Sequence, residues 1–224
     1  MIAMEPVKPL PSPVKGFITD AMKTSQSSSI RKAGRPLSFD REAALETAML
    51  LFWRHGYEST SLGDLTAAMG VSPPSVYAAF GNKKGLFLES VRRYLSHPTS
   101  PQEIIDAAGS ARDAALALMS GAAQTFTDPT TPPGCMLATS AISVSASAAD
   151  VQAELAALRN AVEAHLRRRI EHAVVDGELP EDTDAGALAG HTTAVIQGMS
   201  TLARDGASRD KLLGVVRIAM RAWG

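Results

Sequence analysis

The stretch Ser72-Pro73-Pro74-Ser75-Val76-Tyr77-Ala78-Ala79-Phe80 places two adjacent prolines directly before an apolar, helix-like run. A proline inside a helix costs about 3 kcal/mol, because it lacks an N–H group and clashes with the preceding turn. The first turn is the exception, since its N–H groups have no intrahelical acceptor. The stretch therefore predicts a helix that begins at the prolines, with Ser72 as its N-cap bonding the N–H of Ser75.

The residues just before this helix predict a second short one. Ser61 and Asp64 have the spacing of a capping box for a helix from Leu62 to Met69, which Gly70 ends. Two short helices joined by Gly70-Val71-Ser72 form a helix-turn-helix. In DNA-binding proteins the second helix of this motif enters the major groove, and a stiff N-terminal end loses little entropy on docking. An αα-corner with no role in DNA binding is the alternative interpretation.

The rest of the chain also reads as helix, and no alternating β-branched segment between hairpin turns occurs. Asp40 and Asn82 are the expected N-caps of the helices that flank the motif. We therefore predict an all-α protein. The further predicted helices cover 40–55, 82–96, 101–126, a short segment from 134, 149–176, 184–205 and 208–223.

Composition narrows the function class. The 224 residues carry a net charge of −1, but residues 1–95 are net positive and residues 96–224 net negative, which favours a polyanion-binding module joined to something else. The acidic second half is also a weak indication against anionic ligands. One cysteine, no secretory signal and no transmembrane segment indicate a cytoplasmic protein without a membrane partner.

Several cationic and hydroxyl side chains flank the predicted motif where phosphates would lie. Arg31, Lys32 and Arg35 precede it, Thr60 and Ser61 begin its first helix, and Lys83 and Lys84 follow its second helix.

The chain at this point resembles TetR-family transcriptional regulators, of the AcrR-like branch. The resemblance is nearly continuous over 34–95, through Gly34-Arg35-Pro36-Leu37, Leu51-Phe52-Trp53-Arg54-His55-Gly56-Tyr57 and Gly81-Asn82-Lys83-Lys84-Gly85-Leu86-Phe87. It is looser around Gly134-Cys135-Met136-Leu137 and from Gly177 to Ser208. The resemblance implies a homodimer, a palindromic double-stranded DNA operator and release of DNA by a small-molecule effector. It also places Thr60, Ser72, Ser75, Tyr77 and Lys83 on typical DNA-contact positions.

The predicted recognition helix has no Arg, Asn or Gln, the residues best suited to bidentate base contacts. Direct readout would then rest on the hydroxyls of Ser72 and Ser75 and on contacts from prolines or Ala78 to thymine methyl groups. We therefore expect the N-terminal arm, through Arg31, Lys32 and Arg35, to supply specificity from the minor groove. The predicted DNA-binding residues are Arg31, Lys32, Arg35, Thr60, Ser61, Ser72, Pro73, Pro74, Ser75, Tyr77, Ala78, Lys83 and Lys84.

The predicted domains are a disordered N-terminal arm (1–33), a helix-turn-helix domain (34–96) and a helical ligand-binding and dimerisation domain (97–224). The last two helices could pack on their own domain or form half of a two-fold four-helix interface, and the family resemblance favours the interface. The candidate interface residues are Leu188, Met199, Leu202, Leu213, Val216, Met220 and Trp223. The candidate pocket residues are Leu116, Met119, Phe126, Cys135, Met136, Thr139, His191 and Val195.

No catalytic, metal-binding or cofactor motif is readable. The five histidines lack metal-site spacing, and Cys135 is interpreted as a small buried residue, with a redox sensor as the alternative. His191 could be a pocket or an interface residue. The sequence thus predicts a ligand-gated repressor rather than an enzyme. The alternatives are a partner-controlled DNA-binding regulator without a ligand and, less favoured, a helical enzyme.

Overall fold

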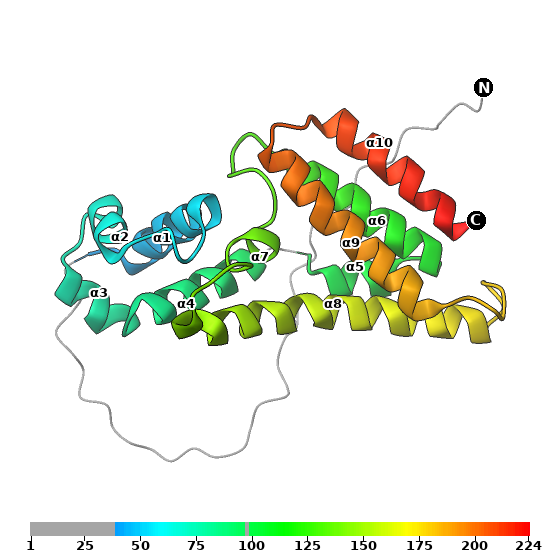
Figure 1. Ribbon diagram of the computed structural model, residues 1–224, viewed down its shortest axis with the longest axis horizontal. Coiled ribbons are helices and arrows are strands. Elements are labelled where there is room, and N and C mark those ends of the chain that lie inside the picture. Colours follow the sequence, from blue (N-terminus) through cyan, green and yellow to red (C-terminus); the bar gives the residue numbers. More distant parts are fainter. Residues whose placement is uncertain (1–38, 97–98) are drawn as a thin grey trace, which may run out of the picture. The chain divides into compact units, whose positions relative to one another are not determined.

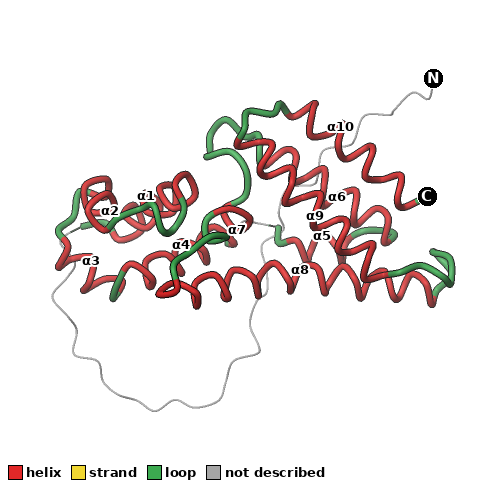
Figure 2. Tube along the Cα trace, viewed as in Figure 1, coloured by secondary structure: helices red, strands yellow, loops and turns green. Residues whose placement is uncertain are grey.

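The computed structural model describes residues 39–96 and 99–224, and all regular structure in these residues is helical, as predicted (Figure 1, Figure 2). The helix-turn-helix half holds α1 (Arg41–His55), α2 (Leu62–Met69), α3 (Pro73–Phe80) and α4 (Lys83–Leu95). The remainder holds α5 (Pro101–Ala107), α6 (Ala111–Thr125), α7 (Met136–Thr139), η1 (Ala146–Ala148), α8 (Ala149–Val175), α9 (Ala185–Arg204), α10 (Arg209–Ala219) and η2 (Met220–Trp223).

The predicted caps set the ends of the first helices. Asp40 accepts hydrogen bonds from the first turn of α1, and Asn82 accepts one from the N–H of Gly85 at 2.8 Å. Ser61 and Asp64 form the predicted capping box of α2. Each of these bonds joins residues three or fewer apart, which is why the sequence alone located these helices.

The predicted single helix over 101–126 is wrong, because the chain forms two helices there. Ala108 takes an extended conformation after α5, and Ser110 then caps α6 by accepting the N–H of Asp113 at 3.0 Å. Glycine at position 109 weakens the helix, and a serine side chain competes well for helix N–H groups at an N-cap. The local cap therefore overrides an apolar periodicity that runs on through both helices.

An aromatic core holds the helix-turn-helix half together. Phe52 and Trp53 of α1 are buried, and Phe52 meets Phe87 of α4 edge to face at 5.0 Å between ring centroids. Leu65 of α2 and Val76 of α3 are fully buried in the same core. Because α4 packs mainly on α1, both helices support the two shorter ones.

A second core lies among α5, α6, α8, α9 and α10. It contains four residues that were predicted to form a dimer interface, so that prediction is wrong for them: Met199, Val216, Met220 and Trp223 are buried within the single chain. Leu188, Leu202 and Leu213 are half-buried and pack against the same core. The larger apolar side chains of α9 and α10 thus serve the chain's own packing.

The two halves are joined through the end of α1. The indole Nε1 of Trp53 donates to the carbonyl of Gly134 at 3.1 Å, and the guanidinium of Arg204 donates to the carbonyls of Trp53 and Arg54 at 3.1 and 2.9 Å. The N–H of Tyr57 donates to the carbonyl of Ser140 at 2.7 Å. The two bonds from Arg204 satisfy carbonyls at the end of α1 that lack an intrahelical donor. Among the described helices, none combines the length and apolar character needed to cross a bilayer.

Candidate DNA-binding surface and ligand cavity

Helix α3 begins as the sequence predicts. Ser72 is the N-cap, Pro73 and Pro74 occupy the first two helical positions, and the N–H of Ser75 donates to the Ser72 hydroxyl at 3.4 Å. The two serine hydroxyls lie 2.9 Å apart. Neither proline removes a needed hydrogen bond at these positions, and both fix a helical φ. The N-terminal end of the helix is therefore pre-ordered.

The two faces of α3 differ sharply in chemistry. Val76 and Phe80 point into the core, whereas Tyr77 is 51% exposed and Ala78 is exposed. Ser75 is half-buried. The exposed surface of the helix thus consists of serine, proline, alanine and one tyrosine, and it carries no charge.

The turn after α3 fixes this helix against α4. A Cβ atom at Gly85 would lie 2.2 Å from the carbonyl oxygen of Phe80, so only glycine fits there. Gly81, with φ +78°, takes a conformation that glycine adopts without strain. The end of α3 and the start of α4 therefore approach each other closely at Gly85.

The two lysines that follow α3 differ in their partners. Lys83 is half-buried over the ring of Tyr57, 4.4 Å from its centroid, and burial lowers the pKa of its ammonium group. Lys84 instead pairs with Asp150 at 2.6 Å and Glu154 at 3.4 Å, and its hydrogen bond to Asp150 raises its pKa. Lys84 therefore departs from the expectation of a free phosphate-binding group, because carboxylates of α8 neutralise it.

The hydroxyl groups before α2 also differ. Thr60 is buried, and its Oγ1 donates to the carbonyl of Gly56 at 2.7 Å, so the expected DNA contact by its side chain is not supported. Ser61 is exposed, but its hydroxyl donates to the carboxylate of Asp64 at 2.6 Å, and this bond lowers the pKa of Asp64. The predicted arm residues Arg31, Lys32 and Arg35 lie outside the described residues.

A cavity of about 430 Å³ lies between the helix-turn-helix half and the second core. Phe126 and Cys135 are the two predicted pocket residues that line it. The other lining residues are not predicted from the sequence, because the lining comes from six separate segments that share no motif. They are Tyr94, Leu95, Thr99, Ser100, Pro101, Ile104, Leu118, Gly121, Ala122, Thr125, Leu137, Ala138, Arg159, Val162, Thr193, Ile196 and Gln197.

The remaining predicted pocket residues lie elsewhere. Met119 and Met136 are fully buried in the two cores, whereas Leu116 is 37% exposed. Helix α6 presents Leu118 and Ala122 to the cavity instead, since residues four apart share a helix face. Thr139, His191 and Val195 do not line the cavity either, and the Thr139 hydroxyl donates to the carbonyl of Cys135 at 2.9 Å.

Two polar side chains meet at one wall of the cavity. The hydroxyl of Tyr94 lies 3.5 Å from the Sγ of Cys135, and burial raises the pKa of the Tyr94 phenol. Cys135 is half-buried, so the interpretation of a fully buried small residue is only partly right. Its N–H donates to the hydroxyl of Ser200 on α9 at 2.8 Å.

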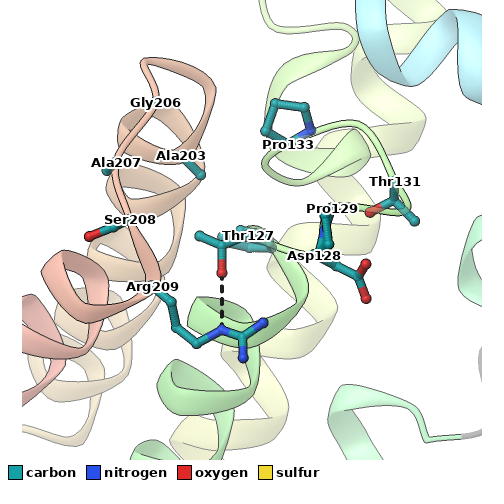
Figure 3. Close-up of a pocket in the computed structure, with 11 residues that line it drawn as sticks. Thr127, Asp128, Pro129, Thr131, Pro133, Ala203, Gly206, Ala207, Ser208 and Arg209 are labelled. Atoms are coloured by element: carbon teal, nitrogen blue, oxygen red, sulfur yellow. Dashed lines mark hydrogen bonds between the residues drawn. The ribbon is translucent and has the colours of Figure 1, made fainter.

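A second hollow of about 500 Å³ lies between the loop after α6 and the turn from α9 to α10 (Figure 3). Asp128 and Arg209 both line it, so opposite charges face the same space. The Nε of Arg209 donates to the hydroxyl of Thr127 at 3.4 Å, as the dashed line in Figure 3 shows. This hollow is more open to solvent than the first cavity.

Across residues 39–96 and 99–224, no cluster of three or more His, Cys, Asp or Glu side chains could hold a metal.

An exposed helix with a pre-ordered start on a helix-turn-helix, joined to a helical half with a partly open cavity, is the arrangement of a DNA-binding protein of the regulatory class. The family model of bacterial regulatory proteins of the tetR family matches residues 44–90, and that of the tetracyclin repressor-like C-terminal domain matches residues 109–218. The chain belongs to the TetR family of transcriptional regulators, whose members are not enzymes.

Individual relatives agree with this assignment over most of the chain. The HTH-type transcriptional repressor ComR of Escherichia coli is 36% identical over 205 residues, which cover 90% of this chain and 98% of ComR. A cysteine-substituted TetR-family regulator CifR, solved with a 26-base-pair double-stranded operator DNA, is 40% identical with a TM-score of 0.80. The match covers 85% of this chain and all of that one. A TetR regulator from Rhodococcus is 38% identical with a TM-score of 0.55, over 81% of this chain and 97% of its own.

Proposed function

We propose that this protein is a dimeric transcriptional repressor, which binds a palindromic operator and releases it when a small molecule fills the cavity. The pre-ordered, exposed start of α3 is the observation that carries the DNA-binding part. Two similar proteins support the same proposal, since ComR is a transcriptional repressor and the CifR variant was solved with operator DNA. As a bacterial gene regulator the protein would act in the cytoplasm.

In the proposed complex, the exposed end of α3 enters the major groove. Ser72 and Ser75 offer hydroxyls to base edges, and Pro73, Pro74 and Ala78 offer apolar contacts to thymine methyl groups. Tyr77, 51% exposed, extends from the same helix toward the phosphates. Because the described motif offers so little charge, the arm residues Arg31, Lys32 and Arg35 remain our proposal for further affinity and for minor-groove specificity.

The outward face of α9 supports a two-fold interface. Ala187, Ala194, Gly198 and Thr201 are exposed, small and uncharged at helical spacing, and α9 has no charged residue before Arg204. Ile218 of the neighbouring α10 is 59% exposed. Small side chains let two helices approach closely. We therefore propose this face as the dimer interface, in place of the larger residues that are buried in the chain's own core. Two recognition helices would then lie about 34–36 Å apart, one turn of DNA.

The position of the cavity supports a ligand-gated mechanism over a regulator without a ligand. Tyr94 and Leu95 at the end of α4 line the cavity, and the start of α4 packs closely against the end of α3 at Gly85. A ligand that binds better when the end of α4 is displaced would favour a conformation with a different spacing of the recognition helices. The coupling between effector and operator would then be reciprocal.

The test is footprinting on the intergenic DNA upstream of the protein's own gene, repeated with a metabolite panel. Ala78→Glu should abolish protection, because it places a negative charge on the groove-facing side of α3. Ala117→Glu is the matched control, since Ala117 is also an exposed alanine within a helix, on α6. Absence of protection at physiological salt, or full protection with Ala78→Glu, would contradict the proposal.

A further inference from the structure

We propose that the cavity selects a small, mainly apolar molecule that carries a carboxylate or a similar anionic group, which Arg159 binds. This inference rests on the proposed function for its regulatory meaning, but the binding itself can be tested without DNA.

The walls of the cavity are predominantly apolar. They include Ile104 of α5, Leu118 and Ala122 of α6, Val162 of α8 and Ile196 of α9. The volume of about 430 Å³ falls within the range of about 300–1,000 Å³ that small-molecule sites occupy. Such walls favour a hydrocarbon or aromatic body, because its burial removes apolar surface from water.

Among the described residues that line the cavity, Arg159 is the one with a charged side chain. Its Nη1 donates to the carbonyl of Leu137 at 2.6 Å, and Leu137 itself lines the cavity, so the guanidinium is fixed at the wall. A guanidinium has five N–H donors in a rigid fork, and a carboxylate can accept two of them in parallel. One donor is used by Leu137, which leaves donors for a ligand.

The charge of Arg159 is uncompensated at the cavity wall. Arg159 forms no ion pair with any residue in the described part of the chain. Glu163, one turn further along α8, is not a lining residue, and its Oε2 accepts the hydroxyl of Thr193 at 2.7 Å. A partly buried cation without a counter-charge is unfavourable beside apolar groups, and a bound anion would relieve that cost.

The local charge reverses the indication from composition. The acidic second half suggests that anionic ligands are disfavoured, but none of the described residues that line this cavity carries a carboxylate. Exposed charges further away than about 10 Å are screened by salt, whereas a charge at the cavity wall is screened much less. Arg159 therefore decides the preference. Gln197 adds an uncharged polar group at the same cavity, on α9.

The test is calorimetric titration of the full chain with matched pairs of acids and alcohols: octanoate against octanol, and phenylpropionate against phenylpropanol. We expect each acid to bind at least about tenfold more tightly than its alcohol, the effect of one charge-assisted contact. Arg159→Gln should abolish the difference, and Arg159→Lys should keep part of it. Arg168→Gln is the matched control, because Arg168 is exposed on the same helix outside the cavity.

Gly121→Leu supplies a second test that does not touch the charge. A side chain at Gly121 meets nothing within 4 Å and points into open space at a lining position, so leucine should fill the cavity and weaken every ligand at least about tenfold. Folding of each variant is checked by circular dichroism. Equal affinity of acid and alcohol, a preference that survives Arg159→Gln, or no binding of either acid at about 5 mM would overturn the inference.

Operator affinity separates this inference from the proposed function. If an acid binds through Arg159 and operator affinity is unchanged, the cavity inference stands and ligand gating is contradicted. If the chain binds operator but discriminates against the acids, the cavity inference is wrong and the regulator proposal stands.

Discussion

Gly85→Ala is predicted to damage the helix-turn-helix more than its size suggests. The new Cβ would lie 2.2 Å from the carbonyl oxygen of Phe80, whereas ordinary contact begins at 3.4 Å, so the two atoms must separate by 1.2 Å. The obstacle is backbone and cannot rotate away. Overpacking of this kind costs about 3 kcal/mol, and the better helix propensity of alanine returns about 1 kcal/mol. We expect a net loss of about 2 kcal/mol.

The assay is thermal unfolding of the full chain at one fixed protein concentration. For a chain of this size, 1 kcal/mol corresponds to roughly 2–4 °C, so Gly85→Ala should lower Tm by roughly 4–8 °C. Gly121→Ala is the matched control, because it makes the same change inside a helix where a Cβ meets nothing within 4 Å. It should raise stability by about 0.5–1 kcal/mol.

Operator binding gives the second readout. Because Gly85→Ala forces the end of α3 and the start of α4 apart, it should weaken operator binding well below the unfolding temperature. Equal shifts in Tm for the two variants would refute the argument from backbone contact.

Three further predictions concern charge and assembly. Lys83→Ala should lower the slope of log affinity against log salt for operator DNA by about 1. Lys84→Ala should leave this slope unchanged, because Lys84 already forms an ion pair with Asp150. Gel-shift assays over a series of salt concentrations measure both slopes. Hydrogen bonds from Ser145 lower the pKa of Glu58 below 4.5 in the folded protein. Their contribution to stability is therefore present above pH 4.5 and is lost as the pH falls through the pKa of Glu58 in the folded protein. Glu58→Gln should reduce this loss of stability at acid pH, measured by urea denaturation over a series of pH values. Gly198→Arg should produce monomers in sedimentation experiments without unfolding, since it adds a charge to the exposed face of α9.

The sequence predicts the helices of the DNA-binding half well, because their caps are local. Asp40, Ser61, Ser72 and Asn82 each bond N–H groups two or three residues away, and such pairs can be read from spacing alone. The break between α5 and α6 has a local signal too, in Ser110. The apolar periodicity continues through Ser110 and masks this signal in the sequence.

The site is predictable only where the same local logic applies. The exposed start of α3 follows from its prolines, but the pairing of Lys84 with Asp150 joins residues 66 positions apart. Arg159 faces a cavity assembled from six segments, which no spacing reveals. The dimer-interface prediction failed for Met199 because both faces of α9 lack charge, and the larger side chains serve the chain's own core.

The double attachment of Trp53 has a consequence for how the chain folds and how such chains recombine. Its indole bonds Gly134 and its carbonyl accepts from Arg204, which lie 81 and 151 positions away. Contacts so distant in sequence raise the contact order and slow the search for the native topology. The helix-turn-helix half therefore depends on the second half for these two hydrogen bonds. A chimera that grafts it onto another sensor half would lose both bonds unless the new half placed a backbone carbonyl and an arginine at the matching positions.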